Sequence, residues 1–265
     1  MKKISAKYKS LSRDELYLIS RIEYERTRLI TTEYVRRLFG NAKKTANILN
    51  RLTQKGRFIK IERGKYILVP IKAPNQLWVP NEFILAKLWM GDIPYYVGYF
   101  TMYNYWGFTE QVPQTVFVLN TMKSRAKLIG NVRFKAVKID ERKYYGIKKI
   151  RIEDEIVCIS DRERTLVDFI YYPLGSFQNI NNVLRANIQQ INMDKFVRYL
   201  ISFPVVSVRK RAGYMLELLN CRDTYLRRIR RTIGSGKTYS LLDPSKASRK
   251  GKLNKDWRII INEPR

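Results

Sequence analysis

Apolar residues recur at helical spacing in two runs near the N-terminus. The first run is preceded by Ser12 and Glu15, whose spacing is that of a capping box. Its expected apolar stripe consists of Leu16, Ile19, Ile22 and Leu29. The second run, Thr31–Phe39, starts with a hydroxyl residue and ends just before Gly40. The pattern therefore predicts two short helices behind a basic tail over residues 1–10.

A third helical run extends from Ala42 to Lys55 and is stopped by Gly56. Its expected buried stripe consists of Ala42, Ala46, Ile48, Leu49 and Leu52. The opposite face is polar and basic, with Lys43, Lys44, Asn47, Asn50, Arg51 and Gln54. Two short β-like runs then surround Arg63-Gly64, which predicts a hairpin over residues 57–69.

Helix, tight turn, basic helix and basic hairpin, in this order, are typical of a winged helix-turn-helix. In that fold the second helix of the motif enters the DNA major groove and the hairpin contacts the backbone or minor groove. The predicted DNA-binding residues are Lys43, Lys44, Thr45, Asn47, Asn50, Arg51, Arg57, Arg63 and Lys65. Side-chain geometry favours Asn47 and Arg51 as base readers. The alternative is a small helical domain with a basic solvated face.

Beyond Pro70 and Pro74 the pattern changes, so we expect one domain over residues 1–72 and a second over residues 76–265. The second contains strand-like runs at 115–119, 132–139, 144–150 and 152–159. Helical runs are expected at 78–90, 160–172, 179–187, 194–203, 207–220 and 223–232, with a closing strand at 257–262. The predicted fold class is α+β, with a small mixed sheet flanked by helices behind the winged helix-turn-helix.

Residues 95–108 form a row that is dense in tyrosine, tryptophan and phenylalanine. The favoured interpretation is aromatic packing on a core helix. The alternative, on a chain this basic, is a platform on which single-stranded bases stack.

Charge indicates the class of partner. The chain carries 52 Lys and Arg against 23 Asp and Glu, a formal net charge of +29. Residues 1–72 have a net charge of +13, residues 73–206 of +5 and residues 207–265 of +11. A chain this basic normally has a polyanionic partner, so both ends are expected to meet one. A second basic patch is predicted at Arg227, Arg228, Arg230 and Arg231, for phosphate or an acidic partner.

Several chemistries are excluded by residue usage. The absence of histidine removes His-dependent triads and general bases, and two distant cysteines build neither a disulfide framework nor a zinc site. We therefore expect no enzyme, no catalytic residue, no metal and no cofactor. A metal-dependent nuclease using Asp140, Glu141, Asp154 and Glu155 is a weaker alternative. No apolar run approaches the roughly 18 residues of a membrane span, and the first residues lack a signal-peptide core, so we expect a cytoplasmic protein without membrane contact.

Short segments spread over about 190 residues carry a family resemblance. They are Arg63–Tyr66, Tyr95–Tyr99, Tyr105–Phe108, Gln111–Pro113, Arg133-Phe134, Ile159–Asp168, Arg211–Gly213, Leu216-Glu217, Leu241–Pro244 and Trp257-Arg258. In this order they resemble the AbiEi-type antitoxins of type IV toxin–antitoxin systems, which also act as transcriptional repressors.

The resemblance implies an N-terminal domain that represses its own operon by binding double-stranded DNA at inverted repeats. It also implies a C-terminal α+β domain that helps to counteract a nucleotidyltransferase toxin. We expect a monomer or weak dimer that pairs on DNA. A stand-alone regulator on the same scaffold, or a basic module that binds RNA or another partner, are the alternatives.

Overall fold

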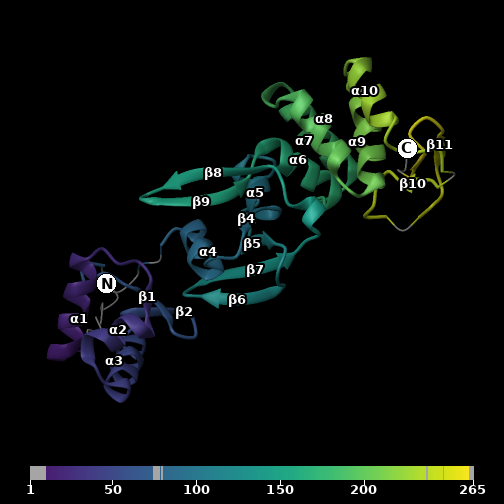
Figure 1. Ribbon diagram of the computed structural model, residues 1–265. Coiled ribbons are helices and arrows are strands. Elements are labelled where there is room, and N and C mark those ends of the chain that lie inside the picture. The colour runs from purple at the N-terminus through teal and green to yellow at the C-terminus, as the bar shows by residue number, and fades with distance from the viewer. Residues whose placement is uncertain (1–9, 74–77, 79, 237, 247, 263–265) are drawn as a thin grey trace, which may run out of the picture. The chain divides into compact units, whose positions relative to one another are not determined.

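The computed structural model describes residues 10–73, 78, 80–236, 238–246 and 248–262 (Figure 1). The predicted basic tail lies outside these residues, apart from Ser10. Helices and strands are both abundant, so the predicted α+β class is confirmed. Contacts divide the chain into two compact units. The first comprises Met1–Asp92 with Ala126–Phe134, and the second comprises Ile93–Arg125 with Lys135–Arg265.

The first unit begins with three helices and a small sheet, in the order that the sequence predicts. Its helices are α1 (Arg13–Tyr24), α2 (Thr32–Phe39) and α3 (Ala42–Gln54). Its strands are β1 (Ile30–Thr31), β2 (Phe58–Glu62) and β3 (Lys65–Leu68). The strands pair antiparallel in the order β1-β3-β2.

Local capping explains where these helices begin and end. Ser12 and Glu15 form the predicted capping box of α1, each side chain accepting from the other residue's backbone N–H. The Thr31 hydroxyl accepts from the backbone of Tyr34, and Asn41 caps α3 in the same way. Gly40 ends α2 with a φ of +65°, a conformation that glycine adopts without strain.

The buried face of each long helix differs from the predicted stripe. In α1 the core takes Leu18, Ile19 and Ile22, whereas Leu16 is 49% exposed. Glu15 is buried beside them, where its carboxylate lies 2.6 Å from Lys55 Nζ.

In α3 the core takes Ile48, Leu49 and Leu52 together with Thr45, while Ala42 and Ala46 are exposed. The predicted stripe was therefore wrong at both alanines. Ile48 hides far more apolar surface than an alanine, so the helix is rotated to bury it.

The first unit also extends past the predicted boundary at residue 72. Helix α4 (Glu82–Met90), capped by Asn81 and ended by Gly91, belongs to it. The Trp89 indole N–H donates to Glu62 of β2 at 3.1 Å, and its ring packs on Phe134 at 5.7 Å between centroids. These contacts explain why α4 and residues 126–134 group with residues 1–72. Residues 74–77, in and just after the predicted linker, lie outside the described residues.

A mixed six-stranded sheet follows, in the order β6-β7-β5-β4-β9-β8. Its strands are β4 (Tyr95–Val97), β5 (Thr115–Asn120), β6 (Arg125–Ile129), β7 (Val132–Lys138), β8 (Ile147–Ile152) and β9 (Glu155–Ser160). Strand β4 pairs parallel to β9 through Val97 and Ile159 and antiparallel to β5. The mixed sheet is as predicted, although β6 was not among the expected strands.

The aromatic row forms β4 and then helix α5 (Phe100–Tyr105), not one helix. Tyr95, Tyr96, Tyr99 and Tyr103 are buried, and the Tyr103 ring packs edge-on against Phe169 at 4.7 Å. The faces of these four tyrosines are therefore not available to single-stranded bases, whereas Tyr105 is 48% exposed.

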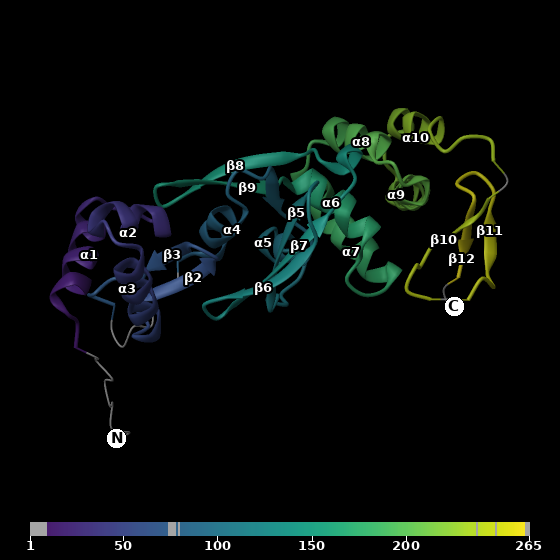
Figure 2. The same cartoon turned by 60° about the horizontal axis from the view of Figure 1, so that its bottom comes forward.

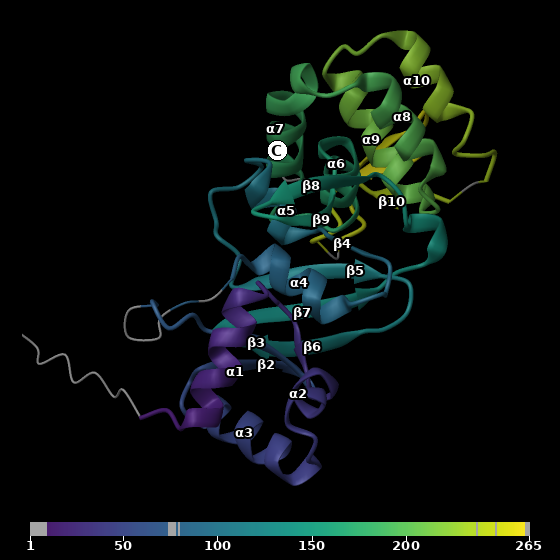
Figure 3. The ribbon, with the colours of Figure 1, turned by 60° about the vertical axis from the view of Figure 1, so that its left-hand side comes forward.

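Five helices complete the core of the second unit and lie together in Figures 1 and 3, coloured green to yellow-green. They are α6 (Arg162–Tyr171), α7 (Phe177–Asn187), α8 (Met193–Ser202), α9 (Val206–Leu218) and α10 (Asp223–Arg230). Short 3₁₀ turns occur at Glu141–Lys143 and Ile188–Gln190. None of the described helices has the length and apolar character needed to cross a membrane.

A second small sheet ends the chain, with β12 (Ile259–Ile261) between β10 (Ser240–Leu241) and β11 (Lys252–Asn254) (Figure 2). The fully buried Trp257 ties it to α9. A Cβ at Gly213 would lie 2.0 Å from the Trp257 ring, so only glycine fits beneath it.

Candidate nucleic-acid interface

The exposed face of α3 is built around a row of long polar side chains. Lys43, Asn47, Asn50 and Gln54 are all exposed and follow one another at helical spacing. At about 100° per residue, this row lies opposite the buried residues Thr45, Ile48, Leu49 and Leu52. Ala46 flanks the row on one side and Arg51 on the other.

The side chains of this face have no partner within the described part of the chain. Lys43, Asn47, Asn50, Arg51 and Gln54 make no side-chain hydrogen bond or ion pair there. A shallow polar depression of about 320 Å³ runs between this face and the start of α1. It is lined by Ser12, Asp14, Asn41, Lys43, Lys44, Asn47, Ile48 and Arg51.

Lys44 differs from its neighbours because the fold already engages it. Its Nζ lies 2.9 Å from an Asp14 carboxylate oxygen and 5.0 Å from the centroid of the Phe39 ring. Part of the Lys44 charge is therefore compensated within the protein. The other side chains on the exposed face of α3 are freer to contact an external ligand.

The β2–β3 hairpin places two more exposed cations in the same unit, Lys60 and Arg63. Its turn is fixed by Gly64, which has a φ of +76° and whose carbonyl accepts from Thr32 N–H at 2.9 Å. The register shifts between Lys60 and Glu62, so an extra residue bulges within the hairpin. The start of α2 therefore anchors the hairpin tip.

Two predicted DNA contacts are not accessible. Thr45 is 1% exposed because it lies on the core side of α3. Arg57 is 6% exposed, and its guanidinium donates to the Pro70 carbonyl at 3.2 Å, which closes the base of the hairpin. Both are corrections to the interface expected from the sequence.

Lys65 is half-buried and turned away from the hairpin surface. Its Nζ lies 3.5 Å from the position that a Cβ would take at Gly91, where α4 ends. A cation at a helix C-terminus is favoured by the helix dipole, so this placement serves α4. The sequence analysis missed Ala46 for the exposed face and left Gln54, which it placed on that face, out of the DNA contacts. Including Thr45 in the apolar stripe would have revealed Ala46.

Most of the second basic patch is neutralised by acidic side chains of the same unit. Arg227 pairs with Asp223 at 2.8 Å, and Arg228 pairs with Asp194 at 2.7 Å. Arg230 pairs with Glu217 at 3.0 Å and stacks on the Trp257 ring at 4.7 Å. Arg231 is exposed and has no side-chain partner among the described residues. The predicted acidic partner of this helix is therefore largely the protein itself.

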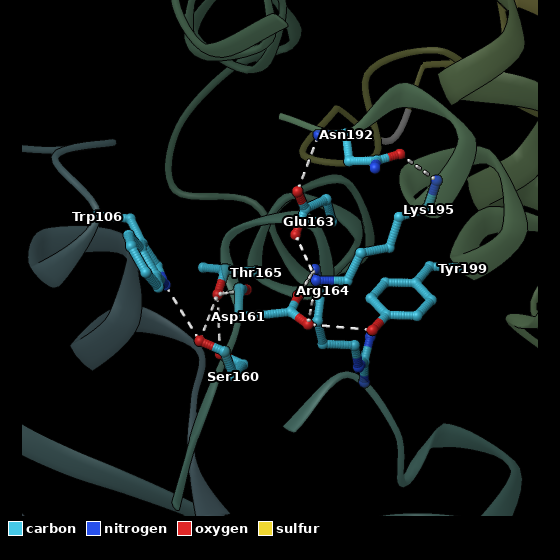
Figure 4. A network of polar contacts seen from close by, with 9 residues as sticks. All are labelled: Trp106, Ser160, Asp161, Glu163, Arg164, Thr165, Asn192, Lys195 and Tyr199. Carbon is cyan, nitrogen blue, oxygen red and sulfur yellow. Dashed lines mark hydrogen bonds and ion pairs between the residues drawn. The ribbon is translucent and has the colours of Figure 1, made fainter. Parts of the chain in front are cut away.

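A cluster of titratable groups forms a polar network at the start of α6 (Figure 4). The Asp161 carboxylate caps the helix by accepting from Arg164 N–H at 2.8 Å. Tyr199 donates its hydroxyl to Asp161 at 3.0 Å, and Lys195 Nζ lies 3.0 Å from both Asp161 and Glu163. Burial opposes the charge of Glu163, but hydrogen bonds from Asn192 N–H and Lys195 hold its pKa below the ordinary value.

Arg164 of α6 also forms an ion pair with Asp168 at 2.9 Å. The two side chains are 1% and 0% exposed. Arg164 also donates to the Tyr96 hydroxyl and to the Lys143 carbonyl, at 3.2 and 3.0 Å. Burial raises the pKa of Asp168 to about 6, and the Arg164 guanidinium opposes that rise. The pair is closed to solvent and holds α6 against the sheet, so it is structural.

Many segments that carry the family resemblance meet inside the second unit. Trp106 donates its indole N–H to the Ser160 carbonyl at 3.1 Å. Arg211 donates to the Leu241 carbonyl at 2.9 Å, and Trp257 donates to Glu217 at 2.9 Å. These segments frame the fold, and Gln111–Pro113 also line an open cavity of about 300 Å³ beside Phe100 and Phe117. No group of three or more His, Cys, Asp or Glu residues with metal-binding geometry occurs among the described residues.

Comparisons with known proteins give a fold relative. No protein-family model matches the chain, and no curated protein matches it. The chain is similar to the crystal structure of the Rv2827c protein from Mycobacterium tuberculosis, with a TM-score of 0.68 and 12% sequence identity. The match covers 95% of this chain and 92% of that one. At this identity the likeness shows the fold alone.

Proposed function

We propose that the first unit is a winged helix-turn-helix that binds double-stranded DNA. In this proposal α2 and α3 form the helix-turn-helix across Gly40-Asn41, α3 enters the major groove, and the β2–β3 hairpin is the wing. The protein then acts as a transcriptional repressor. It is not proposed to break or form covalent bonds.

The observation that carries this proposal is the unpartnered polar face of α3. Five long side chains remain without internal partners there, in a segment with strong positive charge. Residues 31–68 contain ten Lys and Arg against two Asp and Glu, a net charge of +8. Such a charge attracts the phosphate backbone, and uncommitted amides supply donors and acceptors for base edges.

The proposed roles follow from position on the unit. Asn47 and Asn50, at the centre of the exposed face, read bases. Lys43 and Arg51 contact phosphates at the start and the flank of the face, and Lys60 and Arg63 contact the backbone from the hairpin. Arg51, which side-chain geometry alone favours as a base reader, is assigned to phosphate because it lies off the central row.

We further propose that the protein is an AbiEi-type antitoxin that represses its own operon and counteracts a nucleotidyltransferase toxin. This rests on the order of the sequence segments that resemble that family. Coexpression with a nucleotidyltransferase encoded beside it should restore growth of cells that the enzyme arrests. If growth stays arrested while promoter binding is intact, the protein is a stand-alone regulator.

The DNA-binding proposal is tested with the purified protein, its own promoter fragment and a random duplex of equal length, at several salt concentrations. We expect tighter binding to the promoter that persists at about 0.2 M salt. Equal, weak binding to both duplexes with a steep salt dependence would contradict a repressor and favour the RNA-binding or partner-binding alternative. Added Mg²⁺ should leave both duplexes uncut, and cleavage would favour a nuclease.

A further inference from the structure

The central row of α3 is rich in amides. Asn47, Asn50 and Gln54 occupy three of its four positions, and the arginine of the exposed face, Arg51, lies to the side. Each amide presents one acceptor oxygen and one donor nitrogen side by side. The fold leaves these atoms without partners in the described chain, so they are free to pair with a ligand of matching pattern.

That pattern matches adenine and mismatches guanine. In the major groove, adenine offers an N7 acceptor and an N6 donor, which pair with the two ends of an amide. Guanine offers two acceptors there and is read best by arginine or lysine. An amide oxygen facing guanine would lose its partner, which costs binding energy because buried polar groups need one.

Ala46 adds an apolar contact beside this row. It is exposed, one helical turn after Lys43 and one before Asn50. In an A·T pair the thymine C5-methyl group lies in the same groove as the adenine acceptor and donor, and small apolar side chains contact it. The exposed face therefore matches an A·T pair in two ways: the amides pair with adenine, and the alanine contacts the thymine methyl group.

The length of the row sets the size of the site. Asn47 and Gln54 are seven residues apart, which is about 10 Å along a helix with a 1.5 Å rise. Stacked base pairs are about 3.4 Å apart, so the row faces roughly three consecutive pairs. We propose that α3 recognises a short run of A·T pairs, with Asn47, Asn50 and Gln54 reading adenines and Ala46 contacting a thymine methyl group. This inference rests on the proposed DNA-binding function.

The test starts by selecting preferred duplexes from a random pool with the full-length protein. Within the selected site, each adenine is then replaced singly by 7-deazaadenine and each thymine by deoxyuridine. We expect binding to weaken on the order of tenfold at two or three adenines, where an amide pair loses one hydrogen bond. It should weaken about fourfold at one thymine, the equivalent of one buried methyl group.

The matched variants assign each effect to a residue. With Asn50→Ala, 7-deazaadenine should cause no further loss at the position that Asn50 reads, while the other positions keep theirs. Ala46→Gly should likewise abolish the deoxyuridine effect. Gln178→Ala, an exposed amide on α7, is the control and should behave as the wild type.

Two outcomes separate this inference from the proposed function. If the protein selects a sequence but tolerates every 7-deazaadenine and deoxyuridine, or selects G·C pairs opposite α3, the A·T inference is overturned and DNA binding stands. If no sequence is enriched over the random pool, both fail.

Discussion

Helices α3 and α10 are both rich in basic side chains, but they differ in how many of these side chains pair with carboxylates of the protein. On α10, all three arginines pair with carboxylates of the second unit, and Arg230 also stacks on Trp257. On α3, Lys44 is paired, whereas Lys43 and Arg51 and the neighbouring amides have no partner in the described chain. Positive charge in the sequence therefore does not identify a binding face. Charge that the tertiary structure leaves uncompensated marks the face for which we propose DNA binding.

The largest effect on stability is expected for the buried ion pair between Arg164 and Asp168. Arg164→Ala removes the counter-ion of Asp168 and leaves a carboxylate that is fully buried. We expect unfolding free energy to fall by about 3–5 kcal/mol, since an uncompensated buried charge is costly. Urea denaturation followed by circular dichroism measures this. A loss below about 1 kcal/mol would mean that the pair is not the internal support described above.

Arg57→Ala separates structural from DNA-binding arginines within the first unit. Because Arg57 is buried and donates to the Pro70 carbonyl, we expect a loss of stability of about 1.5–3 kcal/mol. Affinity for duplex DNA, measured by fluorescence anisotropy at a temperature where the variant is folded, should stay within about twofold of the wild type. Arg63→Ala, on the exposed hairpin tip, is the matched control. It should weaken binding to duplex DNA and leave stability unchanged. An Arg57 variant of normal stability and weakened DNA binding would restore the sequence-based assignment.

Arg51→Ala tests the unpaired face itself. It should weaken binding to promoter and random duplex alike, on the order of tenfold (about 1.4 kcal/mol), and lower the salt slope by about one, as expected for one phosphate contact. Thermal stability should be unchanged, because the guanidinium has no internal partner. Anisotropy titrations across salt concentrations give both quantities. Selective weakening on the promoter would instead make Arg51 a base reader.

Arg230→Ala is expected to have the smallest effect. It removes a half-exposed ion pair to Glu217 and a stacking contact on Trp257, which together stabilise the second unit by about 0.5–1 kcal/mol. Promoter affinity should not change. Thermal unfolding and anisotropy on the same preparation measure the two effects. Weaker DNA binding without a change in stability would show that α10 acts as a second DNA contact, against the contrast drawn with α3.

Part of the candidate interface was predictable because α3 begins and ends through local chemistry. Asn41 at its start and Gly56 after its end are read directly from the sequence, and so is the turn at Gly64. Which face of α3 points outward was not predictable with the same certainty. Thr45 is a poor candidate for a core by residue type, and Ala46 a good one, yet their positions are exchanged. Ile48 is buried in one cluster with Leu18 and Ile22 of α1, and this long-range packing is not recorded in the local pattern.

The sequence alone determined the order of the first three helices and the hairpin, the α+β class and the high positive charge, because caps, turns and periodicity act over a few residues. The tertiary structure alone decided which cations are free. Arg228 meets a carboxylate that lies 34 residues away, at Asp194, and Lys55 meets Glu15 across 40 residues. Pairing and burial of this kind depend on distant segments that approach one another only in the folded chain, so no local pattern records them.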